Sequence, residues 1–257
     1  MIRFTRVRTK RPTRLAKEVN LREDGTLDKT TVAHLSEGVA MVEEVLDMAA
    51  FADALAAVRP EEALMTGVPT KDRMAARIVT RRALAKIDPP PDDVVARTRD
   101  DFVDPFGPGI MLLDIDPPKD GPAPSRDEIV ELLSSVSSVL ARATMVWRPS
   151  SSSYIARRGG ELIDGLRGQH IYLGLDDATR VSEVEAALEA MLWAAGHGEV
   201  LVSAAGSRLL RCPVDTAVWS PERLIFEAGM VCHPPLEQQH REPVIINPEG
   251  GSSPPPT

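Results

Sequence analysis

The chain has 257 residues, a length that suits one large domain or two smaller ones. Apolar residues make up 43% of it and aromatic residues only 4%, so the core must be filled mainly by aliphatic side chains. The formal net charge of -8 at pH 7 excludes a protein coated in positive charge. It does not exclude nucleic acid as a partner, because a local basic groove can lie on an acidic body.

The two cysteines, Cys212 and Cys232, are far apart and form no Cys-x-x-Cys pair, which argues against a cysteine-rich zinc site and against a disulfide framework. No apolar run approaches the length of a membrane span. The basic N-terminus is not followed by the apolar stretch of a secretory signal. We therefore expect a soluble, cytoplasmic protein with no membrane partner.

Basic residues crowd the first part of the chain, residues 1–29, where Pro12 and Gly25 interrupt any regular element. This pattern predicts an extended or mobile basic arm. The alternative is a contact surface for a phosphate backbone.

Two helices are expected next. In residues 31–58, apolar side chains recur at spacings of three and four, which is typical of an amphipathic helix. Residues 63–65 predict a short strand. Residues 72–87 predict a second helix rich in arginine, with either a solvated basic face or a face that borders a nucleic-acid channel. Because Pro89 to Pro91 break the chain, residues 1–90 are expected to form a basic arm and a helical N-terminal portion.

The stretch from Ile110 to Asp116 predicts a buried strand that ends in two carboxylates, before Pro117 and Pro118 stop the ladder. A period of two places Asp114 and Asp116 on the same face and aliphatic side chains on the other. Neighbouring buried carboxylates repel each other, and a divalent cation such as Mg²⁺ is the usual reason to tolerate them. The alternative is a strand end with solvated aspartates beside a turn.

The remaining elements alternate between helix and strand, which predicts an α/β (α+β) fold, a mixed sheet with helices on one face. Helices are expected after Ser125 or Asp127 and after Asp177 or Thr179, each of which can cap one. The expected strands are residues 144–147, 169–175, 199–204, 208–214 and 223–227. Asp114, Asp116 and His170 should then share the open front face of the sheet. Residues 234–257 accumulate Pro, Gly and Ser, which predicts a tail or linker.

Three separated motifs can now be placed in order: Asp114-Ile115-Asp116, Arg167-Gly168-Gln169-His170, and Asp215 after a strand. This set resembles the archaeo-eukaryotic primase superfamily, the primase-polymerase proteins of plasmids, phages and integrated elements. That family carries an Asp-x-Asp or Asp-x-Glu pair on a strand, a Ser-x-His or Gly-Arg-Arg-Gly-x-His element, and a later third carboxylate. The second motif departs from the pattern, since Leu166 replaces the first Arg and Gly168 stands where many relatives have Ser. The resemblance covers roughly residues 110–226.

The resemblance implies an RRM-like primase-polymerase catalytic core over residues 91–233. It implies template-dependent nucleotidyl transfer on DNA, as a primase and/or DNA polymerase, with two divalent ions, Mg²⁺ or Mn²⁺. Those ions would be held by Asp114, Asp116 and Asp215, and a nucleoside triphosphate by His170 and Arg167. The further candidate residues are Gly168, Ser150 and Ser152 for the nucleotide and Arg148, Arg208, Arg211 and Arg223 for the nucleic acid.

Single-stranded DNA template and nucleotides are the implied partners, with a helicase domain or protein as a further one. No P-loop motif is present, so this sequence carries no such helicase itself. Local alternatives remain: a satisfied histidine at a strand end for His170 and a flexible loop for Ser150 to Ser153. Two other functions also remain open, a metal-dependent nuclease or phosphodiesterase, and a non-catalytic module that binds single-stranded nucleic acid.

Overall fold

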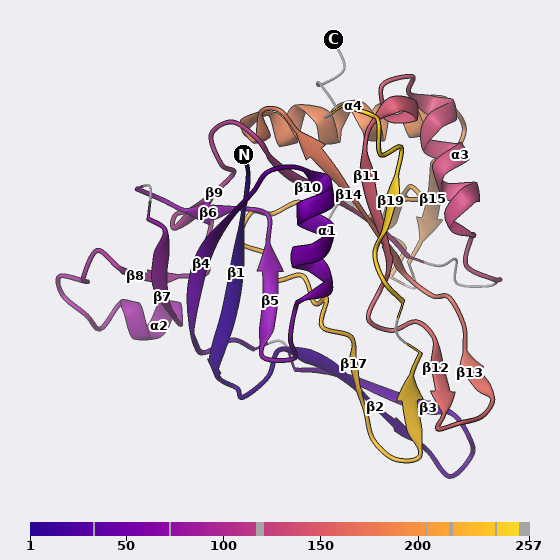
Figure 1. Ribbon diagram of the computed structural model, residues 1–257, viewed down its shortest axis with the longest axis horizontal. Helices are drawn as coiled ribbons and strands as arrows, with labels where there is room; N and C mark the ends of the chain where they lie inside the picture. Colours follow the sequence, from indigo (N-terminus) through magenta and orange to yellow (C-terminus); the bar gives the residue numbers. More distant parts are fainter. Residues whose placement is uncertain are drawn as a thin grey trace.

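The computed structural model describes residues 1–32, 34–71, 73–116, 121–203, 205–215, 218–239 and 241–251 and shows a strand-rich mixed α/β protein (Figure 1). The helices are α1 (Met48–Ala56), α2 (Arg81–Leu84), η1 (Leu140–Arg142), α3 (Arg126–Val136), η2 (Ala178–Arg180) and α4 (Val181–Ala194). The strands are β1 (Ile2–Arg11), β2 (Ala16–Leu21), β3 (Leu27–Val32), β4 (Glu37–Val45), β5 (Glu62–Met65), β6 (Val68–Pro69), β7 (Ala75–Val79), β8 (Val94–Ala96), β9 (Phe102–Val103), β10 (Gly109–Ile115), β11 (Met145–Pro149), β12 (Ile155–Arg157), β13 (Leu162–Asp164), β14 (Gln169–Leu175), β15 (Glu199–Val202), β16 (Arg208–Arg211), β17 (Met230–Cys232), β18 (Leu236–Gln238) and β19 (Val244–Ile246).

The sheet that carries the candidate site has the strand order β10-β14-β11-β19, with each neighbouring pair antiparallel. Along the chain its elements follow the order β10, α3, β11, β14, α4. β14 matches the predicted strand 169–175, and β10 and β11 lie where strands were expected. The sheet is therefore antiparallel throughout, with its central strand β14 contributed late in the sequence.

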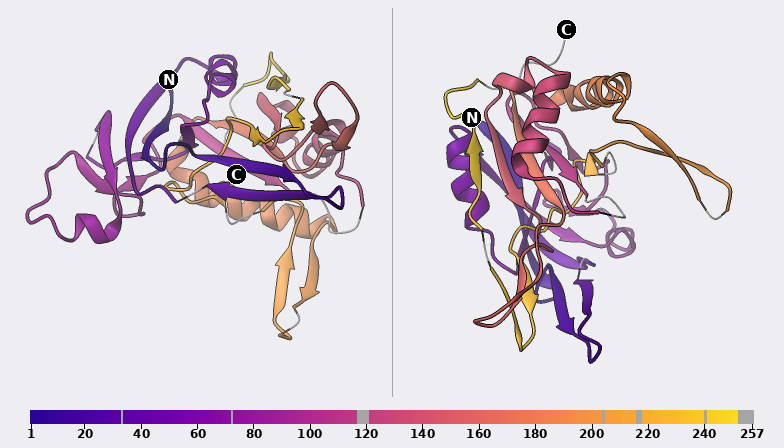
Figure 2. Two further views of the ribbon diagram at one scale, coloured as in Figure 1. Left: turned by 90° about the horizontal axis from the view of Figure 1, so that it is seen from below. Right: turned by 90° about the vertical axis from the view of Figure 1, so that its right-hand side faces the viewer.

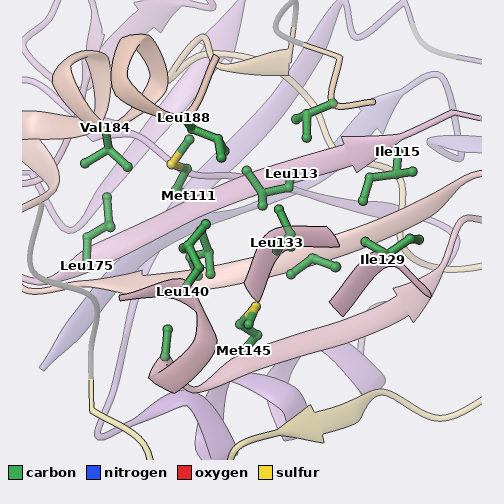
Figure 3. Close-up of a cluster of buried hydrophobic side chains, with 14 of the residues drawn as sticks. Met111, Leu113, Ile115, Ile129, Leu133, Leu140, Met145, Leu175, Val184 and Leu188 are labelled. Carbon is green, nitrogen blue, oxygen red and sulfur yellow. The ribbon is translucent and has the colours of Figure 1, made fainter. Parts of the chain in front are cut away.

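Helices α3 and α4 cover one face of this sheet, as expected from their apolar stripes. Met111, Leu113 and Ile115 of β10 face these helices, and Figure 3 shows them among the packed side chains. A capping box at Ser125 and Glu128 begins α3, so the predicted start of this helix is confirmed. The helix-facing cluster also includes Ile129, Leu133, Leu140, Met145, Ile171, Leu173, Leu175, Val184, Leu188 and Leu192.

The opposite face is not open, as the sequence had suggested. Ile110 and Leu112 of β10 and Tyr172 of β14 pack in a cluster with Phe4 of β1 and Phe51 of α1. Figure 2 shows α1 on the other side of the sheet from α3. The prediction of an open front face was wrong because aliphatic residues occupy both faces along most of β10, and only its last part carries carboxylates.

The N-terminal portion is built from strands, so the prediction of a basic arm followed by helices was wrong. β1, β4, β5, β7 and β8 form one sheet in the order β5-β1-β4-β7-β8. In the segment expected to be a long helix, Gly38, Ala40 and Val42 are buried alternately on β4, and only α1 is helical. Two of the residues behind these spacings, Val39 and Val42, lie on opposite faces of β4, where branched side chains are favoured, and the other two, Leu35 and Leu46, lie just outside the strand.

The second predicted helix, residues 72–87, is also mostly a strand. Ala76 and Ile78 are buried on β7, and Arg77 points outward to Glu37 of β4, with Nη2 at 3.1 Å from Oε1. Only α2 is helical, and residue 72 lies outside the described residues. The arginines therefore do not form one basic helical face. β7 also pairs with β8, so one sheet continues past the break expected after residue 90.

Several other predictions can be compared with the structure. The strand at 63–65 and the two strands near 199–214 are confirmed as β5, β15 and β16. Residues 223–227 form no strand, only an isolated bridge between Leu64 and Ile225. The segment expected to be a linker contains β18 and β19, which pair with β12 and β11. Residues 117–120, which begin with the Pro117-Pro118 stop, and the last residues, 252–257, lie outside the described residues.

The packing of α1 against the sheet predicts a large effect of Phe51→Ala. The Phe51 ring is 1% exposed and makes edge-to-face contacts with Phe4 and Tyr172, at centroid distances of 5.2 and 5.1 Å. We expect a loss of about 3–5 kcal/mol in the free energy of unfolding, measured by urea denaturation. Phe106→Ala, at a ring that is 80% exposed, should change it by less than about 0.5 kcal/mol. Equal effects of the two changes would contradict this packing.

Candidate functional site

Four predicted site residues form one row across the central sheet. Asp114 on β10 is the direct partner of His170 on β14, and His170 is the direct partner of Arg148 on β11. On the other edge of β10, Asp215 forms an isolated bridge with Asp114 and donates its backbone N–H to the Asp114 carbonyl at 2.8 Å. Because direct cross-strand partners point to the same face, these side chains are neighbours on the face opposite α3 and α4.

A second group lies beyond the end of β10. Asp116 lies two residues after Asp114, so the alternation of side chains along a strand points both to the same face, and Asp116 is exposed. A Cβ placed on Gly168 would lie 3.6 Å from the Asp116 Oδ1 atom and 3.0 Å from the Ser150 Oγ atom. The Ser150 backbone N–H also donates to the Gly168 carbonyl at 2.8 Å. Gly168 therefore lets the second motif approach closely the turn at residues 150–153, called here the serine turn, whereas Asp116 would meet an added Cβ at an ordinary contact distance.

The serine turn is tied to the second motif by hydrogen bonds. The Arg167 backbone N–H donates to Ser153 Oγ at 3.0 Å, and the hydroxyls of Ser150 and Ser152 are 2.9 Å apart. Ser150 and Ser153 are buried. The Arg167 side chain is 46% exposed, with Nε at 3.7 Å from Asp164 Oδ1. The turn thus packs against the segment that precedes His170, and the Arg167 guanidinium lies at its surface.

Sequence reasoning missed Glu227, which lies in the centre of the site. His170 donates through Nδ1 to the Glu227 carboxylate, and the Tyr172 hydroxyl donates to the same Oε1 atom at 2.5 Å. Arg148 Nε lies 3.5 Å from Glu227 Oε2, and both side chains are almost fully buried. Glu227 follows an apolar run at 224–226 and belongs to no motif, so no signal in the sequence separated it from an ordinary strand end.

The charges in this cluster act on one another. Burial raises the pKa of Asp114, and the Asp116 and Asp215 carboxylates raise it further, against an opposing effect of His170. Burial alone would lower the pKa of His170, but Glu227 and then Asp114 raise it overall. Burial alone would raise the pKa of Glu227, but His170 and Arg148 lower it overall. The site therefore favours an imidazolium between two carboxylates.

The three aspartates have the oxygen ligands that hard divalent cations prefer. Their backbone positions are adjacent, and a cation would relieve the repulsion that raises the pKa of Asp114. Their side chains do not surround one point. Within the described ranges, no group of three or more His, Cys, Asp or Glu residues has the arrangement of a metal site. The donor set fits a cation in its chemistry, and Asp114 and Asp215 are backbone neighbours, but the carboxylates would need to reorient to enclose one.

A cavity of about 370 Å³ opens beside Asp114 and His170. Its size is within the range of small-molecule sites. Three cationic side chains line it, from Lys17, Arg97 and Arg223, together with an apolar wall. The residues of that wall are Leu112, Val218, Leu224, Ile225 and Phe226. An anion with an apolar part matches this lining.

The predicted arginines occupy different environments. Arg148 is 3% exposed and donates through Nη1 to the Leu55 carbonyl at 2.7 Å, so its guanidinium is enclosed by protein and does not present itself to a nucleic acid. Arg208 and Arg211 lie on the exposed β15–β16 hairpin, which projects from the body of the molecule in Figure 2. Arg223 lines the cavity. Of these four arginines, Arg148 is the buried cross-strand neighbour of His170, and Arg223 is the one in the cavity wall.

No protein-family model, no curated protein and no solved structure matches this chain. Across the described segments, no helix combines the length and apolarity that crossing a membrane requires. We therefore infer a function from the geometry of the row formed by Asp215, Asp114, His170 and Arg148.

The raised pKa of Asp114 predicts that Asp114→Asn stabilises the protein in the absence of divalent ions. The folded state holds this proton more tightly than the unfolded state, so stability is lost as the pH rises through the folded pKa. Asn cannot ionise and avoids that loss. We expect a higher Tm for the variant at pH 7 and a smaller difference near pH 3.9, where the unfolded carboxyl is itself about half protonated.

Asp116→Asn is the matched control, because the Asp116 side chain is exposed and a substitution there should change the Tm little. A Tm of Asp114→Asn equal to or below that of the unsubstituted protein at pH 7 would contradict the prediction.

Proposed function

We propose that this chain catalyses template-dependent nucleotidyl transfer on DNA, as a primase and/or DNA polymerase. The observation that carries the proposal is the direct pairing of Asp114 with both Asp215 and His170. Residues from three motifs that lie far apart in the sequence are adjacent on one face of one sheet. Asp116 and Gly168 continue the same arrangement beyond the strand ends.

The strand order supports an RRM-like core for this activity. β10, β11 and β14 act as its first three strands, with α3 and α4 between and after them. The short segment at Asp215 then lies on the free edge of β10, where a fourth strand would pair. This is the split β-α-β arrangement, in which the second half of the unit returns beside the first strand. β19 adds a further strand at the β11 edge.

The proposed roles follow from position and charge. Asp114, Asp116 and Asp215 would hold Mg²⁺ or Mn²⁺, and such ions supply charge neutralisation and activate the attacking hydroxyl in nucleotidyl transfer. His170, as an imidazolium, donates from Nε2 to a triphosphate oxygen. Lys17 and Arg223 add positive charge along the cavity wall. A nucleoside triphosphate, with its polyanion and its apolar base, matches this lining. Single-stranded DNA template and an associated helicase are proposed partners.

Primer extension tests the proposal. Purified protein is incubated with a single-stranded template, either annealed to a primer or without one, in Mn²⁺ and either NTPs or dNTPs. We expect synthesis, and we expect Asp114→Ala or Asp116→Ala to reduce its rate by about 10²- to 10³-fold or more, as when preorganised charge stabilisation is removed. Asp92→Ala is the control, because Asp92 is exposed and pairs with Lys71.

Three outcomes would contradict the proposal, and two of them would assign a different function. Degradation of DNA without added nucleotides, lost in Asp114→Ala, would assign a metal-dependent nuclease. Binding of single-stranded DNA that survives EDTA and falls steeply with salt, without any synthesis, would assign a non-catalytic binding module. Full synthesis by the Asp114→Ala, Asp116→Ala double variant would show that catalysis does not need these two carboxylates.

The cavity lining gives a further prediction for Lys17→Met. Lys17 lies on β2 and brings an ammonium group to the cavity that contains Asp114 and His170. We expect the KM for the triphosphate to rise about 10-fold, the typical effect of losing a hydrogen bond to a charged group, with a smaller change in kcat. Lys10→Met, at an exposed position on β1, should leave KM unchanged. An unchanged KM in Lys17→Met would place the triphosphate elsewhere.

A further inference from the structure

We propose that the β15–β16 hairpin is a self-association surface, through which two copies of this chain join their β15 edges antiparallel into one four-stranded sheet. The occupant of the surface is a second copy of the same chain. This pairing does not depend on the proposed function, and it is tested by measuring association and not catalysis.

The hairpin carries apolar side chains that the described part of the chain leaves uncovered. Every residue of β15 and β16 is exposed. The large apolar residues are between 39% and 71% exposed, and they are Val200, Leu201, Val202, Leu209 and Leu210. The hairpin projects from the body in Figure 2, and within the described residues its strands pair only with each other. Because a two-stranded sheet is marginally stable alone in water, such a patch marks an interaction surface.

Apolar residues lie on both faces of the hairpin, and this selects the kind of occupant. Direct cross-strand partners share a face, so Val200 and Leu210 lie on one face and Leu201 and Leu209 on the other. A membrane or a flat protein surface would cover one face and leave the other exposed. A strand added at the edge extends both faces at once, provided that its own side chains are apolar on both. Apart from Glu199, β15 is such a strand, so a second copy meets this requirement.

The backbone pattern determines which groups of β15 point to its outer edge. Ser203 donates its backbone N–H to the Ser207 carbonyl at 2.9 Å, so these residues form a hydrogen-bonded pair. Such pairs alternate with non-bonded pairs along an antiparallel ladder. Leu201 therefore bonds inward to β16, while the N–H and C=O groups of Val200 and Val202 point outward. The outer edge of β15 thus offers donors and acceptors to an added strand.

A two-fold axis at Leu201 satisfies these groups with a second copy. In that register, Val200 of each copy lies opposite Val202 of the other, and both residues can exchange backbone hydrogen bonds. The valine face and the leucine face of each hairpin then continue across the new pair. A shift of one residue would place Val200 opposite Leu201, whose groups already bond to β16. An axis at Val200 would instead place the Glu199 carboxylate opposite Leu201.

Charge selects the β15 edge over the β16 edge. Arg208 and Arg211 lie on β16, so pairing through β16 would bring the guanidinium groups of both copies onto two adjacent strands. β15 carries one charged residue, Glu199, which is the cross-strand partner of Arg211. With the axis at Leu201, Glu199 lies opposite Ser203 of the other copy. The arginines then lie on the two outermost strands of the joined sheet, where they do not oppose one another.

Sedimentation velocity of the intact chain over a range of protein concentrations tests the pairing. We expect a monomer at low concentration and a dimer whose fraction rises with concentration. Because the joined strands are short, the association should be weaker than that of a standard-sized interface. High salt should not abolish the dimer, since no ion pair joins the two copies. A chain that remains monomeric up to about 1 mM would overturn the proposal.

Val200→Pro and Leu210→Pro form a matched pair of variants. The two residues are direct cross-strand partners and are 50% and 64% exposed. In each, proline removes an N–H that points outward, so the β15–β16 ladder keeps its hydrogen bonds. We expect Val200→Pro to abolish the dimer and Leu210→Pro to leave its fraction close to that of the unsubstituted protein. Loss of the dimer in Leu210→Pro alone would assign the β16 edge and overturn the proposal.

A second pair of variants changes no backbone group, so it decides the question even where proline disturbs the hairpin. Leu201→Glu places two carboxylates opposite each other at the two-fold axis, whereas Leu209→Glu, on the same face, places them on the outer strands. We expect a larger loss of dimer in Leu201→Glu, with an unchanged Tm of the monomer in both. Equal dimer fractions in the two variants would overturn the pairing through Leu201.

A contact with nucleic acid is the competing use of the hairpin, since Arg208 and Arg211 lie on it. Hydrogen exchange of the backbone amides separates the two. Raising the protein concentration should slow exchange at Val200 and Val202, and a single-stranded oligonucleotide should not. Slower exchange with the oligonucleotide in a chain that stays monomeric, reversed by salt, would assign the hairpin to nucleic acid and overturn the proposal.

Discussion

The antiparallel pairing of β10 with β14 is the constraint on which the candidate site depends. Its register makes Asp114 the direct partner of His170 and leaves Tyr172 two residues away on the same face. A shift of one residue would send His170 to the face covered by α3 and α4. That face is filled with aliphatic side chains, and burying a charged imidazole there would be costly. The apolar packing on that face therefore also determines the polar geometry on the other.

The two ends of β10 differ in what their side chains contact. Its first part carries aliphatic side chains on both faces, which α3 and α4 cover on one side and α1 and β1 on the other. Its last part carries Asp114 on the face where this N-terminal cover gives way to the cavity. The N-terminal portion therefore has two roles. Its β1 and α1 bury part of one sheet face, and its β2 supplies Lys17 to the cavity wall.

The central elements were predictable because local signals and tertiary structure agree there. Three local signals each predicted an element that the structure contains: the aliphatic run of β10, the capping box at Ser125 and the alternation of β14. The order of the three motifs predicted that Asp114, Asp215 and His170 lie close together, and the pairings of Asp114 with His170 and with Asp215 put them side by side. The N-terminal portion was misread because valine spacing on β4 imitates a helical period. Glu227 was missed because its importance comes only from burial between His170 and Arg148, which sequence does not display.

The pairing of β19 with β11 has a consequence for any shortened form of the protein. β19 covers the outer backbone edge of β11 along Met145 to Trp147. A chain cut at residue 233, where composition suggested the domain would end, would present those N–H and C=O groups to solvent beside buried apolar residues. Bare strand edges of this kind recruit strands from other molecules. The Pro-, Gly- and Ser-rich segment therefore contributes a protective strand, and its removal would favour oligomers formed edge to edge.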